Sequence, residues 1–353
     1  MESRVTLPMT PPDAPLRLRL DTAAMLHNWR ALDRLSGAAR AGAAVKADGY
    51  GLGAVRVVSA LSSAGCADFF VAHSCEAAPL LALIPSGSLS VLHGPQSEAD
   101  AAFIKSAGIK PTINSLEQAQ RWIAAGGGLC DVMVDTGINR LGLAMDELGS
   151  ELLQRLDVDL LMSHLASAED DVTLNAVQQR RWREACAALP HRRASLANSA
   201  GIMLGTDFHG DLTRPGLALY GGVPCAALAN EIKQVVFPEA AIMQVRDVAA
   251  GEGIGYNSTF VAERAMTVGV ISLGYADGYL RSWSGKGEMV AGDARLPVIG
   301  RVSMDMTVID LSAAPQLKAG DWVTANYALP EASALSGLSQ YELLTSLGRR
   351  FVR

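Results

Sequence analysis

The residues best suited to chemistry begin with a lysine at the end of an apolar run. In AAVKADGYGLG, residues 43–53, Lys46 follows Ala43, Ala44 and Val45, which have the small apolar character of a buried strand. A lysine that leaves such a strand must project into a cleft or find a partner, because burying an unpaired ammonium group is costly. Lys46 is therefore either a structural lysine or a reactive amine.

Other polar residues follow later strand-like runs in the same way. Arg140 lies in DTGINRLG, His164 ends DLLMSH, Ser199 lies in NSAG, and Arg214 and Gly216 lie in RPGL. A hydroxyl group together with glycine amides, as in NSAG and RPGL, is the kind of donor set that binds a phosphate dianion. These segments predict a phosphate site near a reactive lysine.

The elements that must position these residues form a repeating pattern. Eight β-type runs, spaced mostly by roughly twenty residues, are each followed by a segment of helical composition. Eight consecutive βα units predict a closed parallel (β/α)8 barrel, a TIM barrel, with active residues at the C-terminal ends of the strands. The eight runs are AAVKA (43–47), DFFVA (68–72), LSVLH (89–93), KPTI (110–113), DVMVD (131–135), DLLMSH (159–164), RASLA (193–197) and DLTR (211–214).

The alternative to a barrel is an open doubly wound sheet. That fold usually carries GxGxxG directly after its first strand. GYGLGA only resembles this signature, because Lys46 stands between the strand and the glycines. The sequence therefore favours the barrel.

The pattern changes near Ala240, where β-rich runs such as AIMQVRDV, MTVGVISL and MTVIDL are separated by AGEG, SGKG and AGD turns. Such runs and turns predict a mostly β domain. The predicted organisation is a barrel over residues 22–235 and a β-rich C-terminal domain over 236–353, joined by the N-terminal strand 15–21.

Composition narrows the class of function. Of 353 residues 49% are hydrophobic and 19% charged, and the net charge is −6 with both signs mixed, which predicts a globular protein and argues against nucleic-acid binding. Five scattered cysteines without a CxxC pair indicate neither disulfides nor zinc. Residues 1–15 contain no apolar leader and no later run reaches membrane length, so we expect a cytoplasmic enzyme without membrane contact.

His164 has two possible chemistries at this stage. With the acidic run Glu169, Asp170 and Asp171 nearby it could indicate a metal site, but no second histidine stands at ligand spacing and the run is typical of a solvated loop. We therefore predict no metal. A lysine that faces a phosphate site across a barrel mouth is instead the arrangement that binds pyridoxal 5'-phosphate, the cofactor that serves as an electron sink at an α-carbon.

The segment VKADGYG resembles the VKANAYG lysine motif of the alanine racemases. The family's other motifs follow in the same order over residues 17–350, and their joint order makes chance a poor explanation. They are VDTGINRLG, SHLASAED, NSAG, TRPGLALYGG, GYNSTF, GYADGYLR, GRVSMDM and YELLTSLGRR.

The resemblance implies racemisation of L- and D-alanine, for peptidoglycan, by a homodimer with shared active sites. Lys46 would form the covalent bond to pyridoxal phosphate and act as one base, and Tyr256 of the opposite subunit would be the second base. Arg214 would face the pyridine nitrogen, supported by His164. The resemblance further implies cofactor binding by Tyr50, Ser199, Gly216 and Leu217, and substrate binding by Arg140 and, from the partner chain through its backbone, Met304.

Three positions depart from the family pattern. Many relatives carry a carbamylated lysine that positions the neighbouring arginine, and here that position is Met133. The family's usual histidine after the YG of the lysine motif is Leu52. A phosphate-binding tyrosine that narrows the substrate entrance is matched to Arg349, which predicts one phosphate ligand fewer and a wider entrance.

Other functions remain open at this point. The protein could racemise serine or a broader set of amino acids. A barrel-type pyridoxal phosphate decarboxylase shares the two-domain plan, but TRPG and GYNSTF fit it poorly, because such enzymes generally have an acidic residue at the pyridine nitrogen. A non-enzymatic carrier of the cofactor would have no use for the second domain or for Tyr256.

Overall fold

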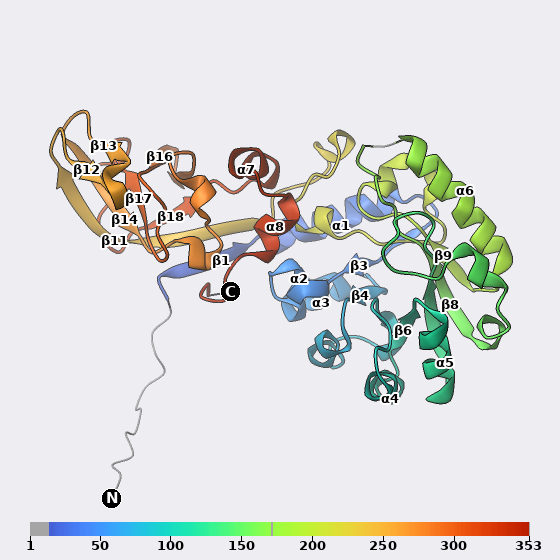
Figure 1. Ribbon diagram of the computed structural model, residues 1–353. Coiled ribbons are helices and arrows are strands. Elements are labelled where there is room, and N and C mark those ends of the chain that lie inside the picture. The colour runs from blue at the N-terminus through green and yellow to red at the C-terminus, as the bar shows by residue number, and fades with distance from the viewer. Residues whose placement is uncertain (1–13, 171, 353) are drawn as a thin grey trace, which may run out of the picture. The chain divides into compact units, whose positions relative to one another are not determined.

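The structure, a computed structural model, describes residues 14–170 and 172–352, which form two compact units (Figure 1). The barrel unit comprises Asp21–Val235 and Gln340–Thr345. The β unit comprises Val236–Ser339 with the flanking segments 14–20 and 346–352. The proline-rich start of the chain, Asp171 and Arg353 lie outside the described residues.

The barrel unit is built on parallel strands that follow one another in chain order. Seven of them form one sheet: β3 (Ala43–Ala44), β4 (Phe69–Val71), β5 (Leu89–Val91), β6 (Lys110–Ile113), β7 (Leu129–Met133), β8 (Asp157–Met162) and β9 (Arg193–Ser195). The eighth, β10 (Leu212–Thr213), pairs in parallel with β2 (Arg40–Ala41), which directly precedes β3.

Backbone hydrogen bonds close this ring on both sides of β10. Gly42 N donates to Thr213 O at 2.9 Å, and Ala44 N donates to Pro215 O at 2.9 Å. On the other side Arg214 N donates to Ala197 O at 2.9 Å. The predicted parallel barrel is confirmed, with β2 and β3 together serving as its first strand.

The helices outside the strands are fewer than the sequence predicted. Helix α1 (Thr22–Leu35) precedes the barrel, and α3 (Ala54–Ser63), α4 (Glu98–Ala107), α5 (Leu116–Ala124) and α6 (Val172–Ala188) follow four of the strands. The described segments after β4, β7, β9 and β10 contain only short 3-10 turns, so the prediction of a helix after every strand was wrong. Glycines with positive φ, such as Gly137, Gly142, Gly205 and Gly221, interrupt the last three of these segments.

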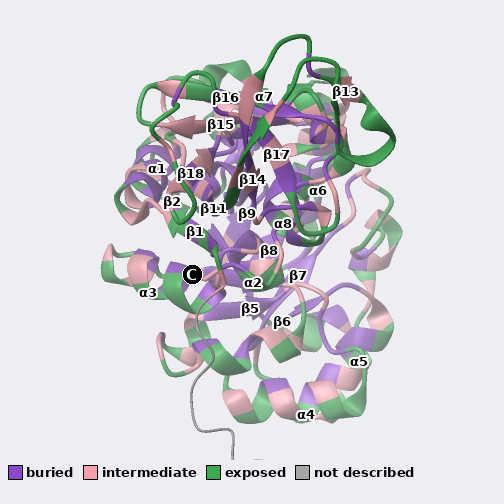
Figure 2. Ribbon diagram, turned by 90° about the vertical axis from the view of Figure 1, so that its left-hand side faces the viewer, coloured by how far each residue is buried: buried purple, intermediate pink, exposed green. Residues whose placement is uncertain are grey.

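Helix α1 shows how the local sequence sets the elements of this unit. The Asp21 side chain accepts a hydrogen bond from Ala24 N at 2.8 Å and caps the helix, as its sequence predicts. Met25, Trp29 and Leu32 lie on its buried face. The barrel strands are buried on both faces, as is typical of parallel sheets, whereas α4 and α5 alternate between buried and exposed residues (Figure 2).

The β unit is a closed antiparallel sheet, which confirms the prediction of a mostly β C-terminal domain. Strand β11 pairs with β14 along one part of its length and with β18 along another, and this closes the ring. The N-terminal strand β1 (Leu16–Leu20) pairs with β11 in the register Leu16↔Ala240. The ring contains β11 (Val236–Val248), β14 (Met266–Ile271), β17 (Thr307–Asp310), β16 (Ala294–Ile299), β15 (Glu288–Ala291) and β18 (Trp322–Ala325).

Smaller elements complete the β unit. Strands β12 (Gly253–Ile254) and β13 (Phe260–Val261) pair with each other, and helix α7 (Leu329–Ser336) follows β18. Helix α8 (Gln340–Thr345) belongs to the barrel unit instead. Within the described chain, no helix combines the length and apolarity needed to cross a membrane.

Candidate active site

Lys46 stands at the start of a left-handed turn. Strand β3 ends at Ala44, earlier than the sequence predicted, and the short element α2 (Lys46–Tyr50) has φ/ψ of 54°/47° at Ala47, 54°/49° at Asp48 and 63°/44° at Gly49. Tyr50 also has a positive φ, 57°. With Gly51, at φ 83°, five consecutive residues have a positive φ, which is rare in chains of L-amino acids because the Cβ crowds the following carbonyl oxygen. The turn places both Lys46 and Tyr50 in the lining of one cavity.

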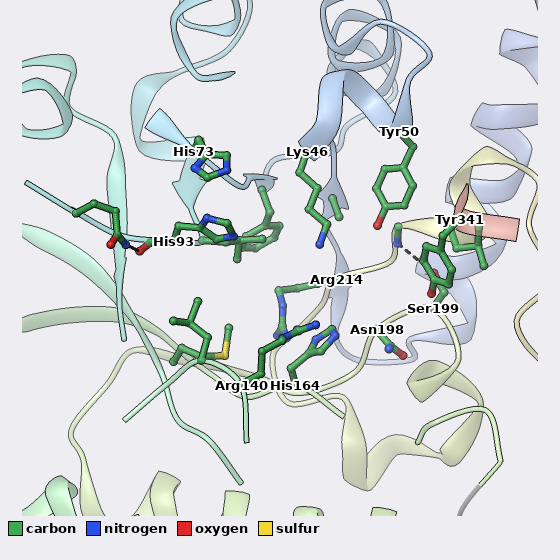
Figure 3. Close-up of a pocket in the computed structure, with 18 residues that line it drawn as sticks. Lys46, Tyr50, His73, His93, Arg140, His164, Asn198, Ser199, Arg214 and Tyr341 are labelled. Carbon is green, nitrogen blue, oxygen red and sulfur yellow. Dashed lines mark hydrogen bonds between the residues drawn. The ribbon is translucent and has the colours of Figure 1, made fainter. Parts of the chain in front are cut away.

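This cavity, of about 840 Å³, lies in the barrel unit and gathers most of the predicted site residues (Figure 3). Lys46 points into it from above Arg140, Arg214 and His164, while Tyr50, Ser199 and Tyr341 lie to one side. The predicted residues that line it are Lys46, Tyr50, Arg140, His164, Ser199, Arg214, Gly216 and Leu217. Strand ends far apart in sequence thus converge, as the barrel requires.

Positive charge dominates the region around Lys46. Burial, together with Arg140 and Arg214, lowers the pKa of Lys46, while Glu76 opposes that change. Burial and the same two arginines lower the pKa of His164 to about 3, so its imidazole is neutral at pH 7. Burial lowers the pKa of Arg214 only to about 10, so its guanidinium stays charged.

Arg214 is held by backbone carbonyls and not by a carboxylate among the described residues. Its Nη1 donates to Ser195 O at 2.9 Å and also to Ser195 Oγ, and its Nη2 donates to Ser163 O at 2.5 Å. These oxygens lie at the ends of β8 and β9, and the guanidinium is buried. The arginine is therefore a fixed cation that faces the cavity from between two strands.

A polar cradle lies on the side of Tyr50. Ser199 Oγ accepts hydrogen bonds from Gly216 N at 3.0 Å and Ala218 N at 3.3 Å. A Cβ added at Gly216 would meet the Tyr50 hydroxyl oxygen at 2.2 Å, so the backbone and this hydroxyl approach each other closely. Amides and hydroxyls directed at one point bind phosphate groups well. A phosphate-bearing cofactor with an aldehyde for Lys46 fits these residues.

The loop that carries Arg140 is organised by Asp135. Its carboxylate accepts hydrogen bonds from the backbone nitrogens of Gly137 at 2.8 Å, Asn139 at 3.1 Å and Arg140 at 2.9 Å. Gln178 of α6 joins this loop to the next, because its Nε2 donates to His164 O at 3.0 Å and to Thr136 Oγ1 at 3.2 Å. These hydrogen bonds fix the backbone at Arg140 and at His164.

Met133 and Leu52 occupy the positions where the sequence departs from the family pattern. Met133 packs with Phe70, Leu160, Met162 and Leu212, so an apolar cluster takes the place of a charged side chain. Leu52 is 1% exposed and belongs to the hydrophobic core. Neither side chain has an oxygen or nitrogen atom that could accept a hydrogen bond from Arg140.

The expectation about Arg349, a residue of the β unit, stays a prediction, and a tyrosine of the barrel unit lines the cavity. Arg349 is not among the cavity residues, whereas Tyr341 of α8 lines the cavity with its ring 6.3 Å from that of Tyr50. Burial raises the pKa of Tyr341 to about 12, so its hydroxyl keeps its proton. Tyr341 begins the YELLTSLGRR motif, for which the sequence predicted no contact with the cavity.

Two histidines that line the cavity were not predicted as site residues. His73 and His93 lie on the side of Lys46 away from Tyr341, with ring centroids 4.3 Å apart in an edge-to-face arrangement (Figure 3). They follow β4 and β5, so their positions after strand-like runs were a usable signal. No group of three or more metal-binding side chains was found among the described residues.

Tyr256 and Met304 are not among the residues that line the cavity. Both belong to the β unit, where Tyr256 is 65% exposed and Met304 53% exposed. Large side chains exposed to this degree are available for contact with another chain.

Two family models match the chain, the N-terminal domain of alanine racemase over residues 20–224 and the C-terminal domain over 235–353. The chain belongs to the alanine racemase family. The alanine racemase of Rhizobium meliloti is 41% identical, with 96% of each chain covered. The biosynthetic alanine racemase of Agrobacterium fabrum is 40% identical, with 96% of this chain and 93% of that protein covered.

Solved structures of alanine racemases have the same fold. The enzyme from Bartonella henselae, with covalently bound pyridoxal phosphate, superposes with a TM-score of 0.86 at 34% identity, covering 97% of this chain and 99% of that one. The biosynthetic enzyme from Pseudomonas aeruginosa gives 0.85 at 33% identity, covering 96% and 99%. The predicted family is thus confirmed, and the predicted cofactor is the one bound in a relative.

Proposed function

We propose that this protein interconverts L- and D-alanine with pyridoxal phosphate held by Lys46. The observation that carries the proposal is the single cavity in which a lysine amine, two arginines and a phosphate cradle converge. The cradle of Ser199, Gly216 and Tyr50 would hold the phosphate, and Leu217 would line it. When bound, this cofactor supplies an electron sink that makes the α-proton of an amino acid acidic.

Lys46 would move the proton on one face of the substrate. A lysine must lose its proton to act as a base, and its ordinary pKa lies near 10.4. Burial and the nearby arginines lower the pKa of Lys46, which increases the fraction of free amine at neutral pH. Arg140 would bind the substrate carboxylate, because a guanidinium can donate two parallel hydrogen bonds to it.

Arg214 would face the pyridine nitrogen, with neutral His164 beside it. A guanidinium effectively keeps its proton, so it cannot protonate that nitrogen. We infer that Arg214 weakens the electron sink and favours rapid return of the proton over side reactions. The buried, carbonyl-held guanidinium supports this role.

The second base would be Tyr256 of the partner subunit, with the backbone of Met304 from the same subunit contacting the substrate carboxylate. Removal of a proton from one face and return to the other requires two bases on opposite sides. The exposure of both side chains agrees with a homodimer that shares its sites. In this proposal residues 22–235 bind the cofactor, and 236–353 with strand 15–21 serve the partner's site.

The biological role follows from the reaction. D-alanine would be supplied for peptidoglycan, and a cytoplasmic location stays a prediction. Serine is the main competing substrate, since one hydroxyl group more is difficult for a small pocket to reject. We expect a higher kcat/KM for alanine than for serine, and the reverse result would refute the alanine assignment.

The deciding experiment follows L-alanine in deuterated water. The purified protein with pyridoxal phosphate should exchange the α-proton for deuterium and lose optical activity together, measured by NMR and polarimetry. Lys46→Ala should abolish both. Exchange without inversion would contradict the two-base mechanism. Release of carbon dioxide would indicate a decarboxylase. If the protein neither exchanges the α-proton nor reduces the optical activity, a non-enzymatic cofactor carrier becomes the better reading.

A further inference from the structure

The left-handed turn after Lys46 needs support from outside itself. Ala47, Asp48 and Tyr50 are not glycines, so each disfavours its positive φ. The turn's own hydrogen bonds include Gly49 N to Val45 O and Gly51 N to Ala47 O, both at 2.8 Å. Strained conformations of this kind persist only where surrounding contacts fix them.

Glu76 supplies such contacts from the loop after β4. Its Oε1 accepts a hydrogen bond from Ala47 N at 2.7 Å, at the residue next to Lys46. Its Oε2 accepts from Ala72 N at 2.6 Å and from His73 N at 3.1 Å. One carboxylate therefore ties the first residue of the left-handed turn to the end of the neighbouring strand.

The same carboxylate places a negative charge near the Lys46 amine. Arg140 and Arg214 lower the pKa of Lys46 beyond the effect of burial, and Glu76 raises it. The other titratable groups that line the cavity around Lys46 are His73, His93, His164, Tyr50 and Tyr341. His164 is neutral at pH 7, and burial raises the pKa of both tyrosines, so these three add no charge there.

We propose that Glu76 is a positioning residue for Lys46. The Glu76 carboxylate fixes the left-handed turn that orients the Lys46 amine, and its negative charge opposes the positive potential of Arg140 and Arg214. The proposal rests on the proposed function, because it concerns the same lysine. Glu76 lies outside the cavity lining and would act only through Lys46. A purely structural cap of the Ser74–Glu76 turn would leave the chemistry of the amine unchanged.

The test compares Glu76→Gln with a matched control, Glu147→Gln. Glu147 also accepts a backbone hydrogen bond, from Ala144 N at 2.7 Å in the same unit, but it does not line the cavity. The full-length protein, freed of cofactor, is treated with acetic anhydride across a pH series. Mass spectrometry then gives the extent of acetylation of Lys46 relative to exposed Lys286.

In Glu76→Gln the pH midpoint of Lys46 acetylation should move to lower pH, because the opposing negative charge is gone. The kcat for alanine should fall by about tenfold to a hundredfold, since small misplacement of a catalytic group has effects of this size. Glu147→Gln should match the wild type in both the pH midpoint of Lys46 acetylation and kcat. An unchanged midpoint in folded Glu76→Gln, or an equal change in Glu147→Gln, would overturn the proposal.

A second variant, Glu76→Asp, separates the effect of the negative charge from the effect of the hydrogen bonds. It also replaces the first test if Glu76→Gln does not fold. The shorter side chain keeps the charge but cannot span the same distance between Ala47 and Ala72. Its midpoint should stay near the wild-type value while kcat falls, and a wild-type kcat would overturn the positioning role. The acetylation measurement needs no turnover, so absence of racemisation in the wild type would refute the proposed function and leave this test intact.

Discussion

Gly216 leaves no room for a side chain. A Cβ there would lie 2.2 Å from the Tyr50 hydroxyl oxygen and 2.9 Å from its Cζ. Gly216→Ala should therefore push Tyr50 out of the cradle, at a cost of about 1–3 kcal/mol for overpacking. We expect pyridoxal phosphate to bind about five- to 150-fold more weakly, measured by absorbance in a cofactor titration.

The matched control for this substitution is Gly87→Ala. An added Cβ at Gly87 meets nothing within 4 Å, and its φ is not in the left-handed region. Its cofactor affinity should equal that of the wild type. Equal affinity in Gly216→Ala would show that the contact with Tyr50 has no part in cofactor binding.

The backbone conformation of the left-handed turn after Lys46 could be predicted only in part from the sequence. The apolar run before Lys46 predicted a strand, and that much was correct. The positive φ of Ala47, Asp48 and Tyr50 could not be predicted, because these types rarely adopt it and the contacts that impose it come from Glu76, distant in sequence.

At the scale of elements, neighbouring barrel strands share a buried charge network. Lys110 of β6 lies 2.6 Å from Asp159 of β8 and 3.7 Å from Asp131 of β7. Arg193 of β9 lies 2.8 Å from Asp159, and Ser90 Oγ of β5 donates to Asp131 at 2.5 Å. The network thus connects five consecutive strands inside the barrel.

Lys110→Met should destabilise the protein by about 3–5 kcal/mol, because it leaves the buried Asp131 without a cation and removes one of the two cations beside Asp159. The measurement is urea unfolding at neutral pH. Arg192→Met is the control, since it breaks the exposed Arg192–Asp157 pair of 2.7 Å, which is worth about 0–1 kcal/mol. If Lys110→Met and Arg192→Met lowered the free energy of unfolding equally, the network would not contribute more than an exposed ion pair.

One carboxyl group of the network, Asp159, makes stability depend on pH. Burial alone would raise the pKa of Asp159, but hydrogen bonds from Arg193 and Lys110 outweigh it and lower the pKa to about 2. A carboxyl with a depressed pKa contributes stability that is fully present above its usual value of 3.8. That contribution is lost as the pH falls from there towards about 2.

The order of the elements was largely predictable, since each barrel strand from β3 to β10 overlaps one of the eight short β-type runs of the sequence. Helices after β4, β7, β9 and β10 were wrongly predicted, because glycines within the last three loops, such as Gly205, disrupt helical geometry. Tyr341 was missed because α8 follows the whole β-rich segment and yet belongs to the barrel unit.

At the scale of the whole molecule, the proposed homodimer makes a quantitative prediction. If Tyr256 serves the partner's site, a mixed dimer of Lys46→Ala and Tyr256→Phe contains one intact site of two. Random association gives mixed dimers in half of the molecules, so activity should recover to about 25% of the wild type. The measurement is racemisation after the two inactive proteins are unfolded and refolded together.

The control for this experiment mixes Lys46→Ala with Arg214→Ala. Both residues line the cavity of the same barrel unit, so no combination restores a complete site. Activity should stay near zero. Recovery in this mixture, or none in the first, would rule out shared sites.

The place of Tyr341 has a consequence for synthesis on the ribosome. The strands of the barrel unit are complete at Val235, but Gln340–Thr345 belong to the same unit and line the cavity through Tyr341. At about 5–20 residues per second, the intervening hundred or so residues take about 5–20 s to translate. In a nascent chain all the barrel strands are therefore present before Tyr341, the last residue of the cavity lining. We expect tight binding of the cofactor only near the end of translation.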